Sequence, residues 1–216
     1  MANLRTGKYT GQYYGSYLNE SEHLTDEEMK KNAQYIYEVL KYIYHWSDNA
    51  IAGIIGNMQS ESSLNPGRWQ SDNVGNNNGG YGLVQWTPAS KYFDWCESES
   101  RNDASEMDNN IERIVYEVEH NTQYYSTDNY PESFVEFTQS EQSPYYLACA
   151  FAWNYERSYV VLYGTEEKRE ALRQQRGGNA EYWYQYLTSL EPTEPIEPTP
   201  TRRRKKMPVW MMCRPC

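Results

Sequence analysis

The stretch that decides the fold reads SDNAIAGIIGNMQSESSLNPG and covers residues 47–67. It begins with Ser47, a residue type that favours the N-cap of a helix. Apolar side chains then recur at the spacing of one helix face, at Ile51, Ile54, Ile55 and Met58. The sequence Asn-Pro-Gly at 65–67 disfavours helix. The stretch therefore predicts a buried helix that ends near Ser63.

Glu61 is the polar residue that stands out at the end of this helix. It lies three residues after Met58 and seven after Ile54, so it continues the apolar face. A carboxyl that loses solvation favours its protonated form. Such a carboxyl can donate a proton to a leaving glycosidic oxygen. The alternative is a helix-end carboxyl that reaches solvent, and spacing alone does not exclude it.

The rest of the chain is predicted to be mainly α with one small β element, which is an α+β fold. Capping residues and apolar periodicity predict helices over about 25–44, 88–98, 105–118, after Pro131, 144–155 and 179–188. Residues 70–87 are rich in Gly and Asn and are flanked by Trp69 and Trp86. They predict a hairpin or small sheet.

Composition divides the chain into four parts. Residues 1–22 predict an irregular N-terminal arm, and 23–190 predict the folded domain. Residues 191–201 predict a Pro-rich spacer, and 202–216 a basic C-terminal tail. The tail holds six basic and no acidic residues, which leaves −16 for residues 1–201 out of the total of −10. An acidic body argues against nucleic acid as a partner.

The residue inventory also argues against other classes of site. The chain has three histidines, His23, His45 and His120, and their spacing is not that of metal ligands. A Cys–His peptidase is disfavoured because no motif surrounds Cys96 or Cys149. We therefore expect no metal and no cofactor. No apolar run predicts a membrane segment or a signal peptide.

Several motifs together resemble a known superfamily. Glu61-Ser62 at a helix end, Asn65-Pro66-Gly67, and the later stretch 80–88 (GYGLVQWTP) resemble lysozymes and lytic transglycosylases. There, Glu-Ser is followed by a Gly-Leu-x-Gln hairpin. Residues 25–187 as a whole resemble the phage tail lysozyme family, and in detail the muramidase domain of the tail-knob peptidoglycan-degrading protein of short-tailed phages. The stretches 32–36, 154–157 and 180–184 extend this resemblance.

The resemblance implies a two-lobed, lysozyme-like domain with a small β-hairpin lobe, and Glu61 as the general acid. It implies that Gln85 and the segment from Tyr81 to Trp86 line a glycan cleft. Asn154, Tyr155 and Glu156 would form its far wall. Two alternatives stay open: Gln85 as a hydrogen bond within the hairpin, and Glu156 with Arg157 as a structural ion pair.

The second carboxylate has three candidates: Asp72, Asp94 and Glu156. Inverting hydrolases hold the two carboxyls roughly 6.5–9.5 Å apart and retaining ones about 5–5.5 Å. A lytic transglycosylase needs one acid only, because a hydroxyl of the sugar itself attacks. The sequence does not choose between these, and the resemblance to tail lysozymes favours hydrolysis.

The expected function is a tail lysozyme at the tail tip or knob of a phage virion. It would cleave the β-1,4 MurNAc–GlcNAc bonds of the peptidoglycan glycan strand and aid genome entry. Its expected partners are that strand and, through the terminal arms, other tail proteins; no nucleic acid or membrane is expected. The alternatives are a non-catalytic structural or glycan-binding tail protein, a free endolysin and a lytic transglycosylase.

Overall fold

Helix α2 (Asp48–Ser62) is the central element of the fold, and its sequence explains its position. The Ser47 hydroxyl accepts a hydrogen bond from the backbone N–H of Ala50, which caps the helix. The four predicted apolar residues of the stripe are all fully buried. The helix ends at Ser63, whose backbone is left-handed with φ of 53°. The prediction for this stretch is therefore confirmed.

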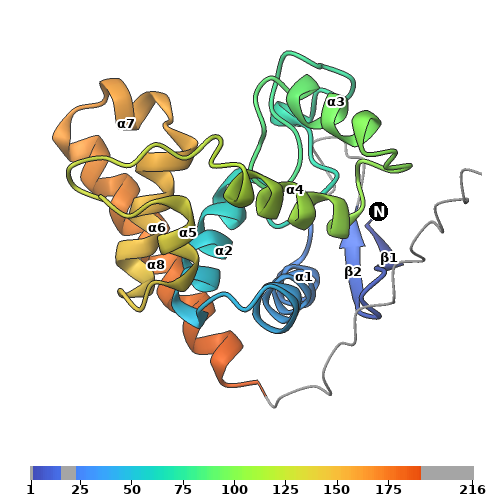
Figure 1. Cartoon of the computed structure of the whole chain (residues 1–216), viewed down its shortest axis with the longest axis horizontal. Coiled ribbons are helices and arrows are strands. Elements are labelled where there is room, and N and C mark those ends of the chain that lie inside the picture. The colour runs from blue at the N-terminus through green and yellow to red at the C-terminus, as the bar shows by residue number, and fades with distance from the viewer. Residues whose placement is uncertain (1, 16–22, 191–216) are drawn as a thin grey trace, which may run out of the picture.

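The computed structural model describes residues 2–15 and 23–190. In Figure 1, α5, α6, α7 and α8 lie on one side of α2, while α3, α4 and a two-stranded hairpin lie on the other. The elements are β1 (Asn3–Thr6), β2 (Gln12–Gly15), α1 (Asp26–Glu38), the π-helix η1 (Val39–Ile43), α2, the 3₁₀ turn η2 (Gln70–Asp72), α3 (Ser90–Ser98), α4 (Met107–Glu119), α5 (Phe134–Gln139), α6 (Pro144–Phe151), the π-helix η3 (Ala152–Glu156), α7 (Tyr159–Tyr163) and α8 (Glu166–Thr188). The predicted α+β, mainly α fold is confirmed.

Most helix boundaries follow from the caps. Thr25 and Glu28 form the predicted capping box at the start of α1, and Ser143 with Pro144 begins α6. Three helix starts differ from prediction. Helix α3 begins at Ser90 and not at 88, α4 begins at Met107 and not at 105, and α8 begins at Glu166 and not at 179. The short helix α7 was not predicted.

The crossing of α2 and α8 explains why the start of α8 was misplaced. The pair Gly177-Gly178 suggests a helix end, yet both lie inside α8. A Cβ added to Gly177 would collide with the ring of Tyr145 on α6, so this glycine permits close packing. On α2, a Cβ at Gly56 would lie 2.7 Å from the backbone nitrogen of Ala180. Tertiary packing therefore overrides the local preference of glycine.

The small antiparallel hairpin lies at the N-terminus, where an irregular arm was expected. Strands β1 and β2 pair in the register Asn3↔Gly15 to Thr6↔Gln12. The ring of Tyr13 is fully buried, and the backbone N–H of Tyr14 donates to Asn32 Oδ1 at 2.6 Å. The expectation for residues 1–22 was therefore wrong for residues 2–15. Residues 16–22 lie outside the described part, as do the predicted spacer and basic tail.

Residues 70–87 do not form the predicted sheet. They contain the turn η2 and single bridges that join Trp69 to Tyr81 and Tyr81 to Trp86. Gln85 has a positive φ of 52°, which is not a strand conformation. The Gly- and Asn-rich composition between Trp69 and Trp86 predicts a hairpin, but turns satisfy the backbone here instead.

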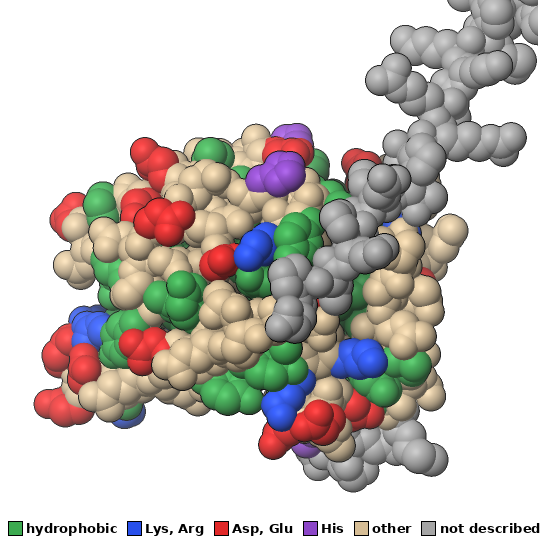
Figure 2. Space-filling model, turned by 90° about the horizontal axis from the view of Figure 1, so that it is seen from below, with side chains coloured by type: hydrophobic (Ala, Val, Ile, Leu, Met, Phe, Trp, Pro, Cys, Tyr) green, Lys and Arg blue, Asp and Glu red, His purple; other side chains and the backbone are tan. Residues whose placement is uncertain are grey.

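The surface reflects the acidic composition of the folded part. Figure 2 shows one face on which Asp and Glu side chains are more numerous than Lys and Arg, and many of them lie along its edge. No helix among the described residues is long and apolar enough to cross a membrane.

Candidate active site

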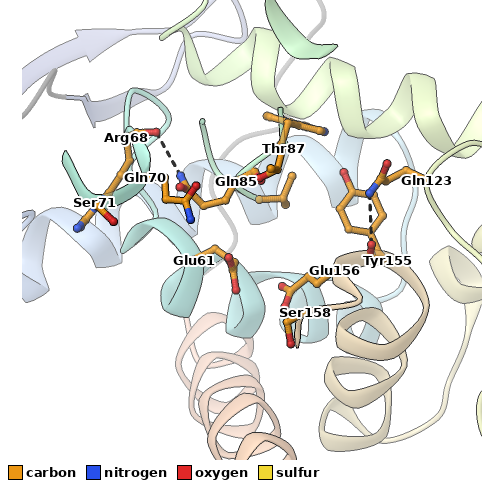
Figure 3. Close-up of a pocket in the computed structure, with 12 residues that line it drawn as sticks. Glu61, Arg68, Gln70, Ser71, Gln85, Thr87, Gln123, Tyr155, Glu156 and Ser158 are labelled. Atoms are coloured by element: carbon orange, nitrogen blue, oxygen red, sulfur yellow. Dashed lines mark hydrogen bonds between the residues drawn. The ribbon is translucent and has the colours of Figure 1, made fainter. Parts of the chain in front are cut away.

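A cleft of about 400 Å³ lies at the C-terminal end of α2. Its walls come from α2, the loops on either side of η2, the loop after α4, and η3 with the residue that precedes α7. Figure 3 shows Glu61, Glu156 and Ser158 on one side and Gln70, Gln85 and Arg68 on the other. The lining residues are Glu61, Arg68, Gln70, Ser71, Val84, Gln85, Trp86, Thr87, Gln123, Tyr155, Glu156 and Ser158.

Glu61 and Ser62 are neighbours at the end of α2, but Glu61 faces the cleft and Ser62 faces the core. The Glu61 side chain faces the cleft and is 23% exposed, so it is less buried than the stripe that precedes it. The Ser62 side chain is buried, and its hydroxyl donates to the carbonyl of Leu83 at 2.9 Å. The two motifs singled out in the sequence are therefore joined physically. Ser62 fixes the loop that carries Gln85 opposite Glu61.

Glu61 shares a cation with a second carboxyl. Nη2 of Arg176, from α8, contacts Glu61 Oε1 and also Glu156 Oε2, the latter at 3.3 Å. The side chains of Arg176 and Glu156 are only 7% and 6% exposed. Burial, followed by the nearby charge of Glu61, raises the pKa of Glu156 to about 8, although Arg176 opposes the shift.

The three candidates for the second carboxylate are placed very differently. Glu156 lines the cleft beside Glu61. Asp72 is paired with Arg68 at 3.3 Å and is not among the lining residues. Asp94 is exposed on α3, also outside the cleft. The structure therefore brings only Glu156 of these three together with Glu61.

The alternative pairing of Glu156 with its neighbour Arg157 is not what the structure shows. The carboxylate of Glu156 contacts Arg176 instead. The Arg157 guanidinium lies over the ring of Tyr125, 4.8 Å from its centroid.

Gln85 lies in the cleft but also holds its own loop. Its Nε2 donates to the carbonyl of Gly82 at 2.9 Å and to that of Arg68 at 3.2 Å. The predicted alternative, a hydrogen bond within the loop, is therefore present. Since both amide hydrogens are engaged, Oε1 is the part of this amide that can accept from a sugar hydroxyl.

Trp86 and Tyr155 line the cleft and are joined by a residue that the sequence did not indicate. The Trp86 indole N–H donates to Glu117 Oε1 at 3.1 Å, and the Tyr155 hydroxyl donates to Glu117 Oε2 at 2.5 Å. Glu117 is 1% exposed and also pairs with Arg113 at 3.0 Å. Burial raises the pKa of Glu117. The partners of its carboxylate oppose this shift, and the hydrogen bond from Tyr155 opposes it most. Glu117 thus connects the two sides of the cleft.

Tyr81 and Asn154 lie behind the cleft surface. Tyr81 is 1% exposed, with its ring among those of Trp69, Tyr92 and Phe93. Asn154 is fully buried, and its Nδ2 donates to the carbonyl of Tyr130 at 2.8 Å. Neither lines the cleft, so both support it from within the core.

Arg176 and Glu117 were missed because their positions give little local signal. Arg176 lies between Gln175 and Gly177 in a stretch with mixed charge, and Glu117 lies among the apolar residues of α4. A carboxyl on the buried face of a predicted helix was the available signal for Glu117. Within residues 2–15 and 23–190, no group of three or more His, Cys, Asp or Glu could hold a metal ion.

The cleft suits a polar, uncharged polymer with hydroxyl and amide groups. Amides and hydroxyls provide most of its polar lining, and two adjacent carboxyls are available for proton transfer. Glycoside hydrolases use a pair of carboxyls at such a cleft.

Comparisons with known proteins show the family of the chain. The phage tail lysozyme family profile matches residues 31–187. The chain is also 40% identical over 174 residues to Morphogenesis protein 1 of Bacillus phage B103, which covers 80% of this chain and 43% of that protein. The chain therefore belongs to the phage tail lysozyme family. It spans less than half the length of this relative.

Proposed function

We propose that this protein is a glycosidase that cleaves the β-1,4 bonds between N-acetylmuramic acid and N-acetylglucosamine in bacterial peptidoglycan. The observation that carries the proposal is the position of Glu61. Its carboxyl faces a polar cleft at the end of a buried helix, beside a second carboxyl, in a member of the phage tail lysozyme family.

Glu61 is the general acid in this proposal. Its proton passes to the glycosidic oxygen as the bond to the anomeric carbon breaks. Gln85 Oε1 and the hydroxyl and amide groups along the cleft orient the sugar. Glu61 and Glu156 contact the same nitrogen of Arg176, so the second carboxyl lies beside the acid. The attacking group is water in a hydrolase and a sugar hydroxyl in a transglycosylase.

The test is lysis of purified peptidoglycan by the wild type and by Glu61→Gln. We expect a loss of about 10²–10⁴-fold, the usual contribution of a general acid. Glu181→Gln is the matched control because Glu181 is exposed on α8, away from the cleft. Equal lysis by Glu61→Gln and the wild type would overturn the role of Glu61. A reducing end in the products identifies hydrolysis, and a 1,6-anhydro end identifies transglycosylation.

One observation favours a second candidate, a glycan-binding protein without catalysis. Glu61 forms an ion pair with Arg176, and an ion-paired carboxylate carries no proton to donate. This candidate predicts that the wild type sediments with insoluble peptidoglycan but releases no fragments. The glycosidase predicts release of fragments by the wild type and binding without release by Glu61→Gln.

We also propose that the protein is carried on the phage tail tip and acts on the host wall during genome entry. The family and the phage relative support this proposal. Other tail proteins are the proposed partners, but residues 2–15 pack on the domain and are no free arm. Mass spectrometry of purified particles tests the location. Detection in lysates but not in particles would indicate a free endolysin.

A further inference from the structure

The contact between Glu61 and Arg176 raises a chemical question about a general acid. A guanidinium at hydrogen-bonding distance favours the ionised carboxylate, whereas the proposed reaction needs the protonated one. The carboxyl of Glu156 contacts the same guanidinium nitrogen, so one positive charge is shared by two acidic groups. If both were ionised, the group would carry a net negative charge in a largely buried site.

Among residues 2–15 and 23–190, Arg176 is the cation that pairs with Glu61 and Glu156. The charged and titratable side chains around it are Glu61 from α2, Tyr155 and Glu156 from η3, Arg176 from α8, and Arg68 from the loop after α2. Arg68 is engaged by Asp72 at 3.3 Å and by the His23 ring at 2.5 Å. The hydroxyl of Tyr155 donates to Glu117. Arg176 is therefore the counter-ion of both acids.

The hydrogen bonds of Glu156 indicate where a proton fits. Among the described residues, its Oε1 is buried and has no hydrogen-bond partner. Burying a charged carboxylate oxygen without a donor costs far more than burying an oxygen of a neutral carboxyl, so the position of Oε1 favours a protonated Glu156. The raised pKa of Glu156 agrees with this geometry.

We propose that Glu61 and Glu156 share one proton at neutral pH, with Arg176 as their common counter-ion. Glu156 is then a positioning residue for the proton on Glu61. When the proton is on Glu61, the ionised Glu156 balances Arg176, so Arg176 no longer holds Glu61 ionised. When the proton is on Glu156, Glu61 takes over the ion pair. The two arrangements belong to one titrating unit. This inference rests on the proposed function only for its catalytic consequence.

The proton balance of one turnover follows. The O–H bond of Glu61 breaks, and the proton passes to the glycosidic oxygen, which keeps the electron pair of the broken C–O bond. The group of three then carries a net charge of −1. The attacking hydroxyl, from water or from the sugar, gives up its proton as it bonds to the anomeric carbon. That proton returns to the carboxyl pair and restores the starting state.

The inference predicts opposite shifts in the alkaline limb of the pH–activity profile. Glu156→Gln leaves Arg176 with Glu61 alone, so the limb moves to lower pH by about 1–3 units. Activity at neutral pH then falls about 10–1,000-fold. Arg176→Gln removes the counter-ion from the pair, so the limb moves to higher pH. The double variant restores a limb close to that of the wild type, and Glu181→Gln leaves it unchanged.

Initial rates of peptidoglycan lysis between pH 4 and 9 measure these limbs, with circular dichroism to show that each variant is folded. A Glu156→Gln limb that coincides with the wild type would overturn the inference. So would shifts of the two single variants in the same direction, or a double variant no closer to the wild type. A merely structural role for Glu156 and Arg176 predicts lower rates without opposite shifts.

A second measurement is independent of activity. Carboxyl ¹³C NMR of glutamate-labelled protein, with Glu61→Gln and Glu156→Gln for assignment, counts protons on the pair. The inference predicts one proton on the pair at pH 7, and none on Glu61 in Glu156→Gln. Two ionised carboxyls in the wild type would overturn it. If the wild-type protein has the shared proton but does not cleave peptidoglycan, the proposed function is wrong and this inference stands. If it cleaves peptidoglycan but lacks the shared proton, this inference is wrong and the proposed function stands.

Discussion

Replacing Glu156 by glutamine should change how the stability of the protein depends on pH. Glu156 is 6% exposed, and burial together with the charge of Glu61 raises its pKa from 4.5 to about 8. Below pH 4.5 the carboxyl is protonated in both the folded and the unfolded chain, so its contribution to stability is fully present. As the pH rises to about 8, the unfolded chain loses this proton while the folded chain retains it. Stability therefore falls with rising pH.

The size of the effect follows from the shift. Each pH unit inside this window lowers the free energy of unfolding by about 1.4 kcal/mol. Over the whole window the loss is on the order of 5 kcal/mol. That is a large part of the about 5–15 kcal/mol that stabilises most domains. The glutamine side chain of the variant has no proton to lose, so the variant gains stability relative to the wild type as the pH rises.

Urea unfolding followed by tryptophan fluorescence at pH 5, 6, 7 and 8 measures this slope. In the Glu156→Gln variant the free energy of unfolding should fall less steeply with pH than in the wild type. It should still fall, because burial also raises the pKa of Glu117 and Asp108. Glu181→Gln, on the surface of α8, should retain the slope of the wild type. If Glu156→Gln and the wild type lose stability in parallel between pH 5 and 8, the proton assigned to Glu156 is not there.

Two further predictions concern the scaffold of the cleft. Gly56→Ala should lower the free energy of unfolding by about 1–3 kcal/mol, because the added Cβ meets the backbone of Ala180 at 2.7 Å. Gly178→Ala on α8 has open space around it and should instead stabilise by about 0.5–1 kcal/mol; thermal melting compares the two, and equal shifts would contradict the close helix crossing. Glu117→Gln should lower stability by about 3–5 kcal/mol at neutral pH, because the Arg113 guanidinium, which is only 13% exposed, loses its partner. Because burial raises the pKa of Glu117, the folded wild type keeps this proton to a higher pH than the unfolded chain does, so the loss in the variant should grow as the pH falls from 7 to 4. A loss in urea unfolding that is smaller at pH 4 than at pH 7 would contradict the raised pKa.

The local sequence predicted those features that neighbouring residues determine. Ser47, the apolar stripe after it and the Asn-Pro-Gly turn suffice to define α2, because a helix is specified by its caps and its periodicity. The same stretch places Glu61 at the end of a buried face. Together with the Gly-Leu-Val-Gln stretch and the other motifs, it carried the family resemblance that the comparison confirms.

Local reasoning did not work where distant segments decide the structure. Residues 2–15 look irregular, but the burial of Tyr13 and the hydrogen bond of Tyr14 with Asn32 organise them into a hairpin. Gly177 and Gly178 resemble a helix end, yet α8 continues through them, and Gly177 packs so closely on the Tyr145 ring of α6 that a Cβ there would collide with it. In both cases tertiary packing outweighs the intrinsic conformational preference of the residues, which is about 1 kcal/mol per residue or less.

For the cleft, too, some features follow from the sequence and others only from the tertiary structure. The sequence by itself singled out Glu61 as the acid to test, because its helix carries it to the end of an apolar face and the motifs that follow resemble those of lysozymes. Only the tertiary structure decided what surrounds it. Arg176 is 115 residues away along the chain, and Glu156 is held against both by burial. Coulomb energy depends on distance in space and on solvent exclusion, and residue spacing along the chain records neither.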